Sequence, residues 1–253
     1  MTKILFAAAA ALLIASGAAA QAASASSAAV KNIVLVHGAL VDGSGWRGVY
    51  DILTKDGYRV SIVQEPLTGL EEDVAATKRI LDQQDGPVIL VGHSYGGSVI
   101  TVAGADPKVK ALVYVAALQP DAGETTGKLV GSMPAPSNDL KTTKDGFVLL
   151  DATKFAADFA ADLPKAQAQF MAVSQMPVSG AAFGAPVTVA AWRSKPSYGI
   201  VATQDRALSP DLERWMYNRS GAKVTEIKAS HAVYISKPRA VADVIEAAAR
   251  AAK

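Results

Sequence analysis

The strongest chemical signal in this sequence is a serine placed between glycines. Residues 92–96 read GHSYG, which has the form G-x-S-x-G. An apolar, β-branched run at 87–91 precedes it, and a small-residue segment predicted to be helical, 97–104, follows it. In a strand–turn–helix of this kind the serine hydroxyl stands clear of the sheet on a strained turn, and the flanking glycines let neighbouring backbones approach. We therefore predict that Ser94 is a nucleophile.

A serine hydroxyl is a weak nucleophile unless a base lies within hydrogen-bond reach, and the chain has three histidines. His93 lies inside the turn, and its side chain should point away from the pocket. His37 belongs to the loop after the first predicted strand. His231 follows the last predicted strand, and the carboxyl ends of parallel strands share one rim with the serine. By elimination and by placement, His231 is the predicted general base.

The base in turn needs an acid that orients it, and two aspartates are candidates. Asp205 follows the predicted strand at 198–203, between the serine and the histidine in chain order. Its carboxylate would accept a hydrogen bond from the imidazole and stabilise the imidazolium. Asp121, after the predicted strand at 109–117, is the second choice. A helix-capping role for Asp205 is less favoured because Ser209 is better placed to cap the next helix.

Acyl transfer also needs donors for the developing oxyanion, and backbone N–H groups can supply them. The N–H after the nucleophile belongs to Tyr95. The second donor is expected from Ala39, in the loop after the first strand, where Gly38 allows a tight turn against the serine. The side chain of His37 is expected to hold this loop together rather than to touch substrate.

Strands and helices that alternate along the chain must position these residues. Six runs are predicted to be strands: 32–36, 58–63, 87–91, 109–117, 198–203 and 222–227. Five segments between or after them are predicted to be helices: 45–55, 70–84, 97–104, 211–220 and 238–252. This alternation predicts an α/β fold with a parallel sheet and right-handed crossovers.

The segment 119–196, between strands four and five, is too long for a simple crossover. Its first part, 120–145, lacks periodicity, and helical patches follow at 154–163 and 165–175. We predict that this insertion forms a cap over the serine. Its large apolar side chains could line an acyl or alcohol pocket, or they could only pack the cap onto the body. The pocket candidates are Met133, Phe159, Phe170 and Met176, and Phe183 is a further apolar residue that could contribute.

The N-terminus is predicted to be a secretion signal. Lys3 precedes a short apolar stretch, 4–15, and small residues around Ala20 fit a cleavage site. We assign 1–20 to a signal peptide, 21–30 to an Ala/Ser linker, and 31–253 to one domain. An uncleaved N-terminal anchor is the alternative. A cleaved signal implies a periplasmic or secreted protein.

Composition excludes several classes of function. The chain of 253 residues has no cysteine, and therefore no disulfide, thiolate metal site or cysteine nucleophile. Its formal charge of +2 and the lack of a clustered basic face do not suggest nucleic acid or anionic lipid as partners. After removal of the signal we expect no membrane association. The serine chemistry described above requires no metal and no cofactor.

With these residues in place, the chain resembles an α/β-hydrolase. VLVHGA at 34–39, VGHSYGG at 91–97, TQD at 203–205 and SH at 230–231 occur in that family's order. The chain is especially similar to the compact branch of plant methylesterases, hydroxynitrile lyases and related bacterial esterases. The resemblance implies an α/β-hydrolase fold with about six mostly parallel strands, flanking helices and a small cap between strands four and five.

The expected function is a serine carboxylesterase that cleaves small esters through an acyl-enzyme. Hydroxynitrile lyases of this branch typically carry Thr after the first-loop histidine and Lys after the catalytic one, whereas this chain has Gly38 and Ala232. This difference favours hydrolysis over a lyase reaction. A cofactor-free perhydrolase or haloperoxidase would keep the same three residues and stays open. A non-catalytic, small-ligand-binding member of the fold also stays open.

Overall fold

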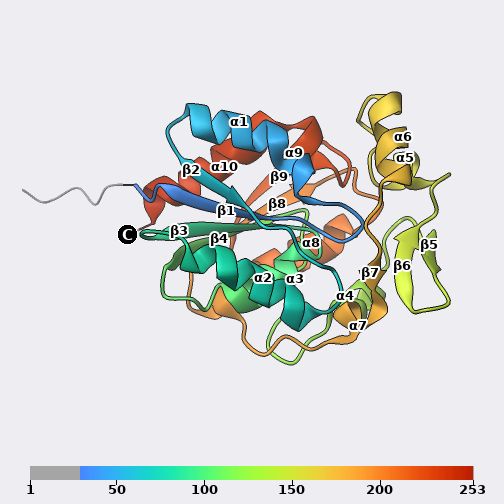
Figure 1. Cartoon of the computed structure of the whole chain (residues 1–253), viewed down its shortest axis with the longest axis horizontal. Helices are drawn as coiled ribbons and strands as arrows, with labels where there is room; N and C mark the ends of the chain where they lie inside the picture. Colours follow the sequence, from blue (N-terminus) through green and yellow to red (C-terminus); the bar gives the residue numbers. More distant parts are fainter. Residues whose placement is uncertain (1–28, 253) are drawn as a thin grey trace, which may run out of the picture.

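The computed structural model describes residues 29–252, and a six-stranded, fully parallel sheet runs through its centre (Figure 1). In spatial order the strands are β2 (Arg59–Ile62), β1 (Asn32–Val36), β3 (Val88–His93), β4 (Val109–Val115), β8 (Ser197–Ala202) and β9 (Lys223–Ile227). These are the six predicted strands, with ends that differ by at most two residues. The predicted fold class is confirmed.

The inner strands are buried on both faces because helices cover both sides of the sheet. In β1, Ile33 and Leu35 belong to one core, whereas Val34 and Val36 belong to the other. Successive side chains of a strand point to opposite faces, so a continuous apolar run is what a strand between two helical layers requires. The uninterrupted apolar runs in the sequence therefore indicated a parallel sheet correctly.

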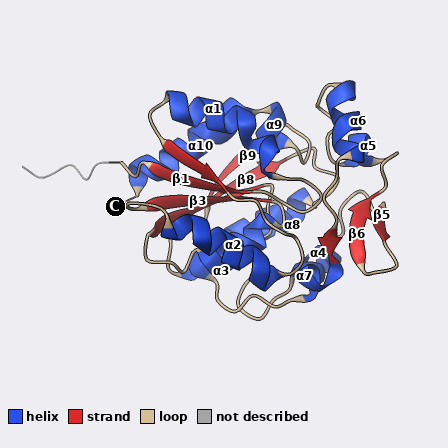
Figure 2. Ribbon diagram, viewed as in Figure 1, coloured by secondary structure: helices blue, strands red, loops and turns tan. Residues whose placement is uncertain are grey.

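Two helical layers enclose the sheet (Figure 2). The helices that share one core are α1 (Arg47–Lys55), α9 (Val233–Ser236) and α10 (Pro238–Ala251). The helices that share the other core are α2 (Leu70–Asp82), α3 (Gly96–Ala103) and α8 (Pro210–Ser220). The predicted helix at 45–55 begins as a 3₁₀ turn, Gly43–Trp46, and α9 is a short helix that the sequence did not indicate.

The insertion lies beyond the carboxyl ends of the strands, as a cap (Figure 1). Its elements there are α4 (Thr126–Ser132), β5 (Leu140–Thr142), β6 (Phe147–Leu150), α5 (Phe155–Asp158), α6 (Lys165–Val173), β7 (Val178–Ser179) and α7 (Gly180–Gly184). The last part of the insertion, with a 3₁₀ turn at Ala191–Arg193, returns to the body and packs against α3. The strands β5, β6 and β7 form a small antiparallel sheet. This sheet and α4 were not predicted, because strands of two to four residues are too short to show a period.

The predicted signal peptide, 1–20, and most of the predicted linker, 21–28, lie outside the described residues. Within 29–252, no helix combines the length and the apolar character that crossing a bilayer requires.

Candidate active site

Ser94 lies on a sharp turn between β3 and α3. Its φ of +52° is in the left-handed region, which side chains other than glycine rarely adopt. The turn also brings backbones very close together. A β-carbon at Gly92 would lie 2.5 Å from the carbonyl oxygen of Gly96, and one at Gly96 would collide with the carbonyl oxygen of His37. The two glycines therefore permit the strained conformation that presents the Ser94 hydroxyl.

Three distant segments bring Ser94, His231 and Asp205 into one hydrogen-bonded chain. The Ser94 hydroxyl lies 2.8 Å from Nε2 of His231, and Nδ1 of His231 lies 2.5 Å from Oδ2 of Asp205. The other oxygen of Asp205 accepts hydrogen bonds of 2.8 Å from the backbone N–H groups of Ala207 and Leu208. With Nδ1 donating to the carboxylate, Nε2 is free to accept the serine proton.

Asp121, the alternative acid, lies elsewhere. Its carboxylate binds both Nε and Nη2 of Arg193 on the outside of the molecule. Ser209 caps α8 by accepting a hydrogen bond from the N–H of Leu212. Both observations leave Asp205 as the carboxylate that contacts His231.

The other two histidines are buried and hold backbone in place. Nε2 of His37 accepts a hydrogen bond from the N–H of Glu65, so the proton on Nδ1 can be donated to the carbonyl of Gly38, 2.9 Å away. Nε2 of His93 lies 3.0 Å from the carbonyl oxygen of His231 and donates to it. Burial lowers the pKa of both side chains, so they stay neutral near pH 7.

A buried glutamate lies next to the acid, and sequence reasoning missed it. Glu213 of α8 is fully buried, and its Oε2 accepts a hydrogen bond of 3.3 Å from the N–H of Ala202. Burial, followed by the negative charge of Asp205, raises the pKa of Glu213 well above its ordinary value. A neutral carboxyl places no second negative charge beside Asp205. A glutamate inside a surface helix carries no sequence signal for such a role.

Two backbone donors lie beside the serine. Ala39 and Tyr95 line the same pocket as Ser94, and within 29–252 neither backbone N–H has a hydrogen-bond partner. The Tyr95 side chain is anchored beneath the pocket, because its hydroxyl donates a hydrogen bond of 2.8 Å to Asp73. The geometry therefore leaves two N–H groups free to bind an oxyanion.

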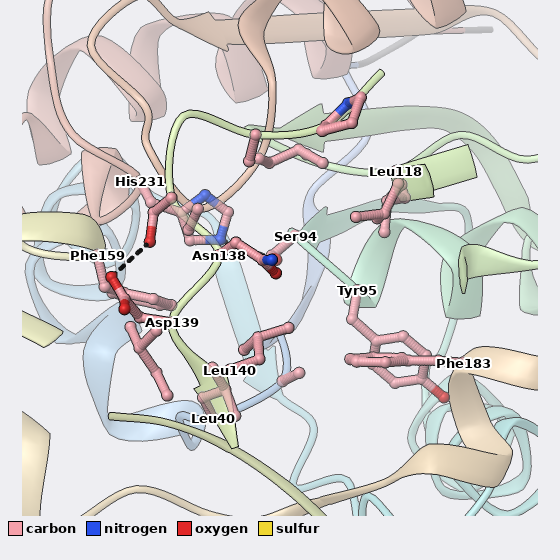
Figure 3. Close-up of a pocket in the computed structure, with 18 of the residues that line it drawn as sticks. Leu40, Ser94, Tyr95, Leu118, Asn138, Asp139, Leu140, Phe159, Phe183 and His231 are labelled. Atoms are coloured by element: carbon pink, nitrogen blue, oxygen red, sulfur yellow. Dashed lines mark hydrogen bonds between the residues drawn. The ribbon is translucent and has the colours of Figure 1, made fainter. Parts of the chain in front are cut away.

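A pocket of about 470 Å³ opens above Ser94, between the sheet edge and the cap (Figure 3). This volume is in the range of small-molecule sites. The body contributes Ala39, Leu40, Ser94, Tyr95, Leu118, Ala207, Leu208 and His231. The cap contributes Gly127, Val130, Gly131, Pro134, Ala135, Ser137, Asn138, Asp139, Leu140, Leu150, Phe159 and Phe183. Within the described part of the chain no lysine or arginine lines this pocket, and Asp139 is its only carboxylate.

Of the cap residues that the sequence proposed for the pocket, Phe159 and Phe183 line it. Phe170 is 69% exposed, because the buried face of α6 carries Ala168 and Ala172 and residue 170 points the other way. Met133 and Met176 are partly buried against the core and are not among the residues that line the pocket. The structure therefore places Phe170, Met133 and Met176 outside the pocket lining.

The pocket residues that the sequence did not indicate fall into two groups. Leu40 directly follows Ala39, and Ala207 and Leu208 come shortly after Asp205, so nearness in sequence to predicted site positions could have identified them. Pro134, Ala135 and the residues 137–140 come from a cap segment whose placement depends on long-range contacts. Among residues 29–252, no group of three or more His, Asp or Glu side chains is arranged to hold a metal ion.

Comparison with known proteins agrees with this geometry. A model of the alpha/beta hydrolase family matches residues 33–244. A pyrethroid hydrolase from Sphingobium wenxiniae is 28% identical over 249 residues, which cover 85% of this chain and 86% of the relative. The alpha-hydroxynitrile lyase of Arabidopsis thaliana is 27% identical over 252 residues, 86% of this chain and 96% of the relative. Plant methylesterases are similar as well.

Solved structures show the same likeness. The crystal structure of a pyrethroid hydrolase from Sphingobium faniae JZ-2 matches with a TM-score of 0.74 and 26% identity, and the match covers 88% of this chain and 98% of that one. The resemblance that the four sequence motifs indicated is confirmed at the level of the family.

Proposed function

Because this chain belongs to the alpha/beta hydrolase family, we propose that it is a serine carboxylesterase that cleaves small, uncharged esters. Its homologues include hydrolases and esterases. The observation that carries the proposal is the connected chain from the Ser94 hydroxyl through His231 to Asp205, with separations of 2.8 and 2.5 Å. This arrangement is what a serine needs in order to attack a carbonyl carbon.

In the proposed mechanism the Ser94 oxygen attacks the ester carbonyl while Nε2 of His231 takes the hydroxyl proton. Asp205 stabilises the imidazolium, and the N–H groups of Ala39 and Tyr95 bind the oxyanion. The bond to the alcohol oxygen then breaks, and His231 returns the proton to the departing alcohol. Water attacks the acyl-enzyme in the second half, with His231 again accepting the proton, and releases the carboxylic acid and free Ser94.

The lining of the pocket supports an uncharged substrate. Its walls are mostly apolar, and within the described residues its ionisable side chains are Tyr95, Asp139 and His231. Burial raises the pKa of Tyr95, so its hydroxyl stays neutral. A substrate carboxylate would have to leave water without meeting a cation, and this costs free energy. Esters with apolar acyl or alcohol groups avoid this cost and bury apolar surface.

The decisive experiment measures kcat and KM for p-nitrophenyl esters with acyl chains of two to eight carbons. Wild type should turn over the esters, and Ser94→Ala should lose nearly all activity. Ser220→Ala, outside the pocket, is the control and should match wild type. Equal rates for wild type and Ser94→Ala would remove the proposal.

A matched pair of substrates tests the charge preference. p-Nitrophenyl butyrate and mono-p-nitrophenyl succinate have four-carbon acyl groups and differ by one carboxylate. The butyrate should have the higher kcat/KM by at least about tenfold, a free-energy difference of about 1.4 kcal/mol. A preference for the succinate would contradict an uncharged substrate.

The hydroxynitrile-lyase alternative has one specific weakness in the site. Ala232, the residue after His231, is fully buried, and no lysine or arginine lines the pocket within the described residues to stabilise a leaving cyanide. Release of cyanide from mandelonitrile at rates above those for the esters would favour the lyase. Tight ligand binding without turnover would favour a binding protein, and peroxide-dependent activity would favour a perhydrolase.

We also propose that the chain is exported and loses its first twenty residues. The apolar stretch at 4–15 after Lys3 and the small residues around Ala20 support this. Intact-mass analysis of the periplasmic and secreted fractions after bacterial expression tests it. A mature N-terminus at Gln21 is expected, and a full-length, membrane-bound product would contradict it.

A further inference from the structure

One short stretch of the cap, residues 155–162, contacts the loop that carries His231 on both sides of the histidine. The carbonyl oxygen of Phe159 accepts a hydrogen bond of 3.0 Å from the N–H of Ala232. The hydroxyl of Ser230 donates to the carboxylate of Asp162 and lies 3.3 Å from the N–H of Ala232. Both chain neighbours of His231 are therefore bonded to the cap.

The same stretch also touches the imidazole itself. The Phe159 ring packs edge-on against the His231 ring, with centroids 4.7 Å apart and an interplanar angle of 80°. Phe159 is 1% exposed, and its other side stacks on Phe155 at 4.8 Å. An aromatic edge held in this way limits rotation of the imidazole.

A third contact reaches the loop that carries the acid. Asp158 is 3% exposed and lies 3.2 Å from Nε of Arg206, the residue after Asp205. The stretch 155–162 thus bridges the loops of His231 and Asp205, although neither loop is part of a regular helix or strand.

The Asp162 carboxylate is a strong acceptor for the hydrogen bond from Ser230. Burial alone would raise its pKa, but hydrogen bonds, from Ser230 first, bring the pKa below its ordinary value. Asp162 is therefore ionised near pH 7. Hydrogen bonds to a charged acceptor are stronger than those between neutral groups. Ser230 is 2% exposed, so its hydroxyl has little access to water as a substitute partner.

We propose that Asp162 and Phe159 are positioning residues, and that the cap stretch 155–162 is a clamp that keeps His231 within reach of Ser94 and Asp205. This inference rests on the proposed function. Nε2 of His93 donates a hydrogen bond to the carbonyl oxygen of His231. The clamp is hydrogen-bonded to Ser230 and Ala232, the residues on either side of His231. Displacement of the cap would therefore loosen the general base as well as open the pocket.

Kinetics of Asp162→Ala test the clamp, because Asp162 does not line the pocket. Misplacing a catalytic group by about 1 Å can cost on the order of 100-fold in rate. Since Asp162 is exposed and water can partly replace it, we expect kcat for p-nitrophenyl butyrate to fall about tenfold while KM changes by less than about threefold. Asp162→Asn keeps an acceptor oxygen and should recover most of kcat.

Asp151→Ala is the matched control within the cap. Asp151 accepts hydrogen bonds from the N–H and hydroxyl of Thr153 but contacts neither catalytic loop. Its kcat should stay within about twofold of wild type. If Asp162→Ala keeps wild-type kcat, or changes KM instead, the clamp is wrong.

Proton NMR provides a readout that needs no turnover. The Nδ1 proton of His231, between the imidazole and Asp205, should give a downfield resonance that disappears in His231→Ala. In Asp162→Ala this resonance should exchange faster with water, and in Asp151→Ala it should not. An unchanged resonance in Asp162→Ala contradicts the clamp. If wild type hydrolyses no ester, the carboxylesterase proposal fails while the NMR comparison still decides the clamp.

Discussion

The carboxyl edge of the sheet and the cap meet at one pocket, but different forces hold the two regions in place. At the sheet edge, Ser94 and the loops of Asp205 and His231 follow β3, β8 and β9 of one parallel sheet, and the hydrogen-bonded ladders of that sheet fix their spacing. In the cap, the elements are short, and a three-stranded antiparallel sheet of strands with two to four residues is its largest ladder. The edge therefore determines which reaction is possible, and the cap determines what fits above the serine.

The largest effect should come from the sheet edge. Asp205→Asn keeps the shape of the acid but removes its charge and favours the wrong imidazole tautomer, so kcat should fall by about 10³- to 10⁴-fold. Steady-state kinetics with p-nitrophenyl butyrate measure this. Asp121→Asn, which loses only the contact with Arg193, should stay within about twofold. Comparable losses in both variants would show that the acid is misassigned.

Glycine substitutions should separate the two regions by stability. A β-carbon at Gly97 would collide with the carbonyl oxygen of Leu118, whereas at Gly184 of the cap it would meet nothing within 4 Å. Gly97→Ala should lower the free energy of unfolding by about 3 kcal/mol, and Gly184→Ala should change it by less than about 0.5 kcal/mol. Urea unfolding followed by circular dichroism compares them. Equal urea midpoints for the two variants would mean that the sheet edge accommodates an added β-carbon as well as the cap does.

Within the cap, pocket and surface aromatics should differ in their effect on substrate. Phe183 lines the pocket, and its ring centroid lies 5.6 Å from that of Tyr95. Phe170, in contrast, is exposed. Phe183→Ala should lower kcat/KM for p-nitrophenyl butyrate by about tenfold, since it removes apolar contact. Phe170→Ala should leave kcat/KM within about twofold. A larger effect at Phe170 would place substrate on the outer face of α6.

The smallest effect is a difference in how stability depends on pH. The raised pKa of Glu213 means that the folded chain keeps a proton which the unfolded chain releases above its ordinary pKa of about 4.5. The free energy of unfolding therefore falls as pH rises from that value towards the folded pKa. Glu213→Gln should remove this loss and stabilise the protein relative to wild type by about 1 kcal/mol more at pH 8 than at pH 5.

The half-buried cap carboxylate Asp151 should behave in the opposite way. Hydrogen bonds from Thr153 lower its pKa, so its contribution to stability is present at neutral pH and is lost as pH falls through the folded pKa. Unfolding curves of Glu213→Gln and Asp151→Asn at several pH values compare the two signs. The same slope in both variants would contradict this assignment of charge states.

The sequence alone determined the sheet and the glycine turn, because long apolar runs, glycine spacing and strand-end positions are local signals. It also identified His231, among the three histidines, as the predicted general base. It favoured Asp205 over Asp121 as the acid. The tertiary structure shows why, since Arg193 binds Asp121 and the loop at 205–208 turns the Asp205 carboxylate to the histidine.

Only the tertiary structure decided the lining of the pocket, the face of α6 that is buried, and the contact of residues 155–162 with the His231 loop. Phe147 pairs with Ser179, and Ala232 bonds to Phe159, across separations that no local pattern reports. Short elements gain most of their stability from such distant contacts, so their places follow from the folded chain as a whole.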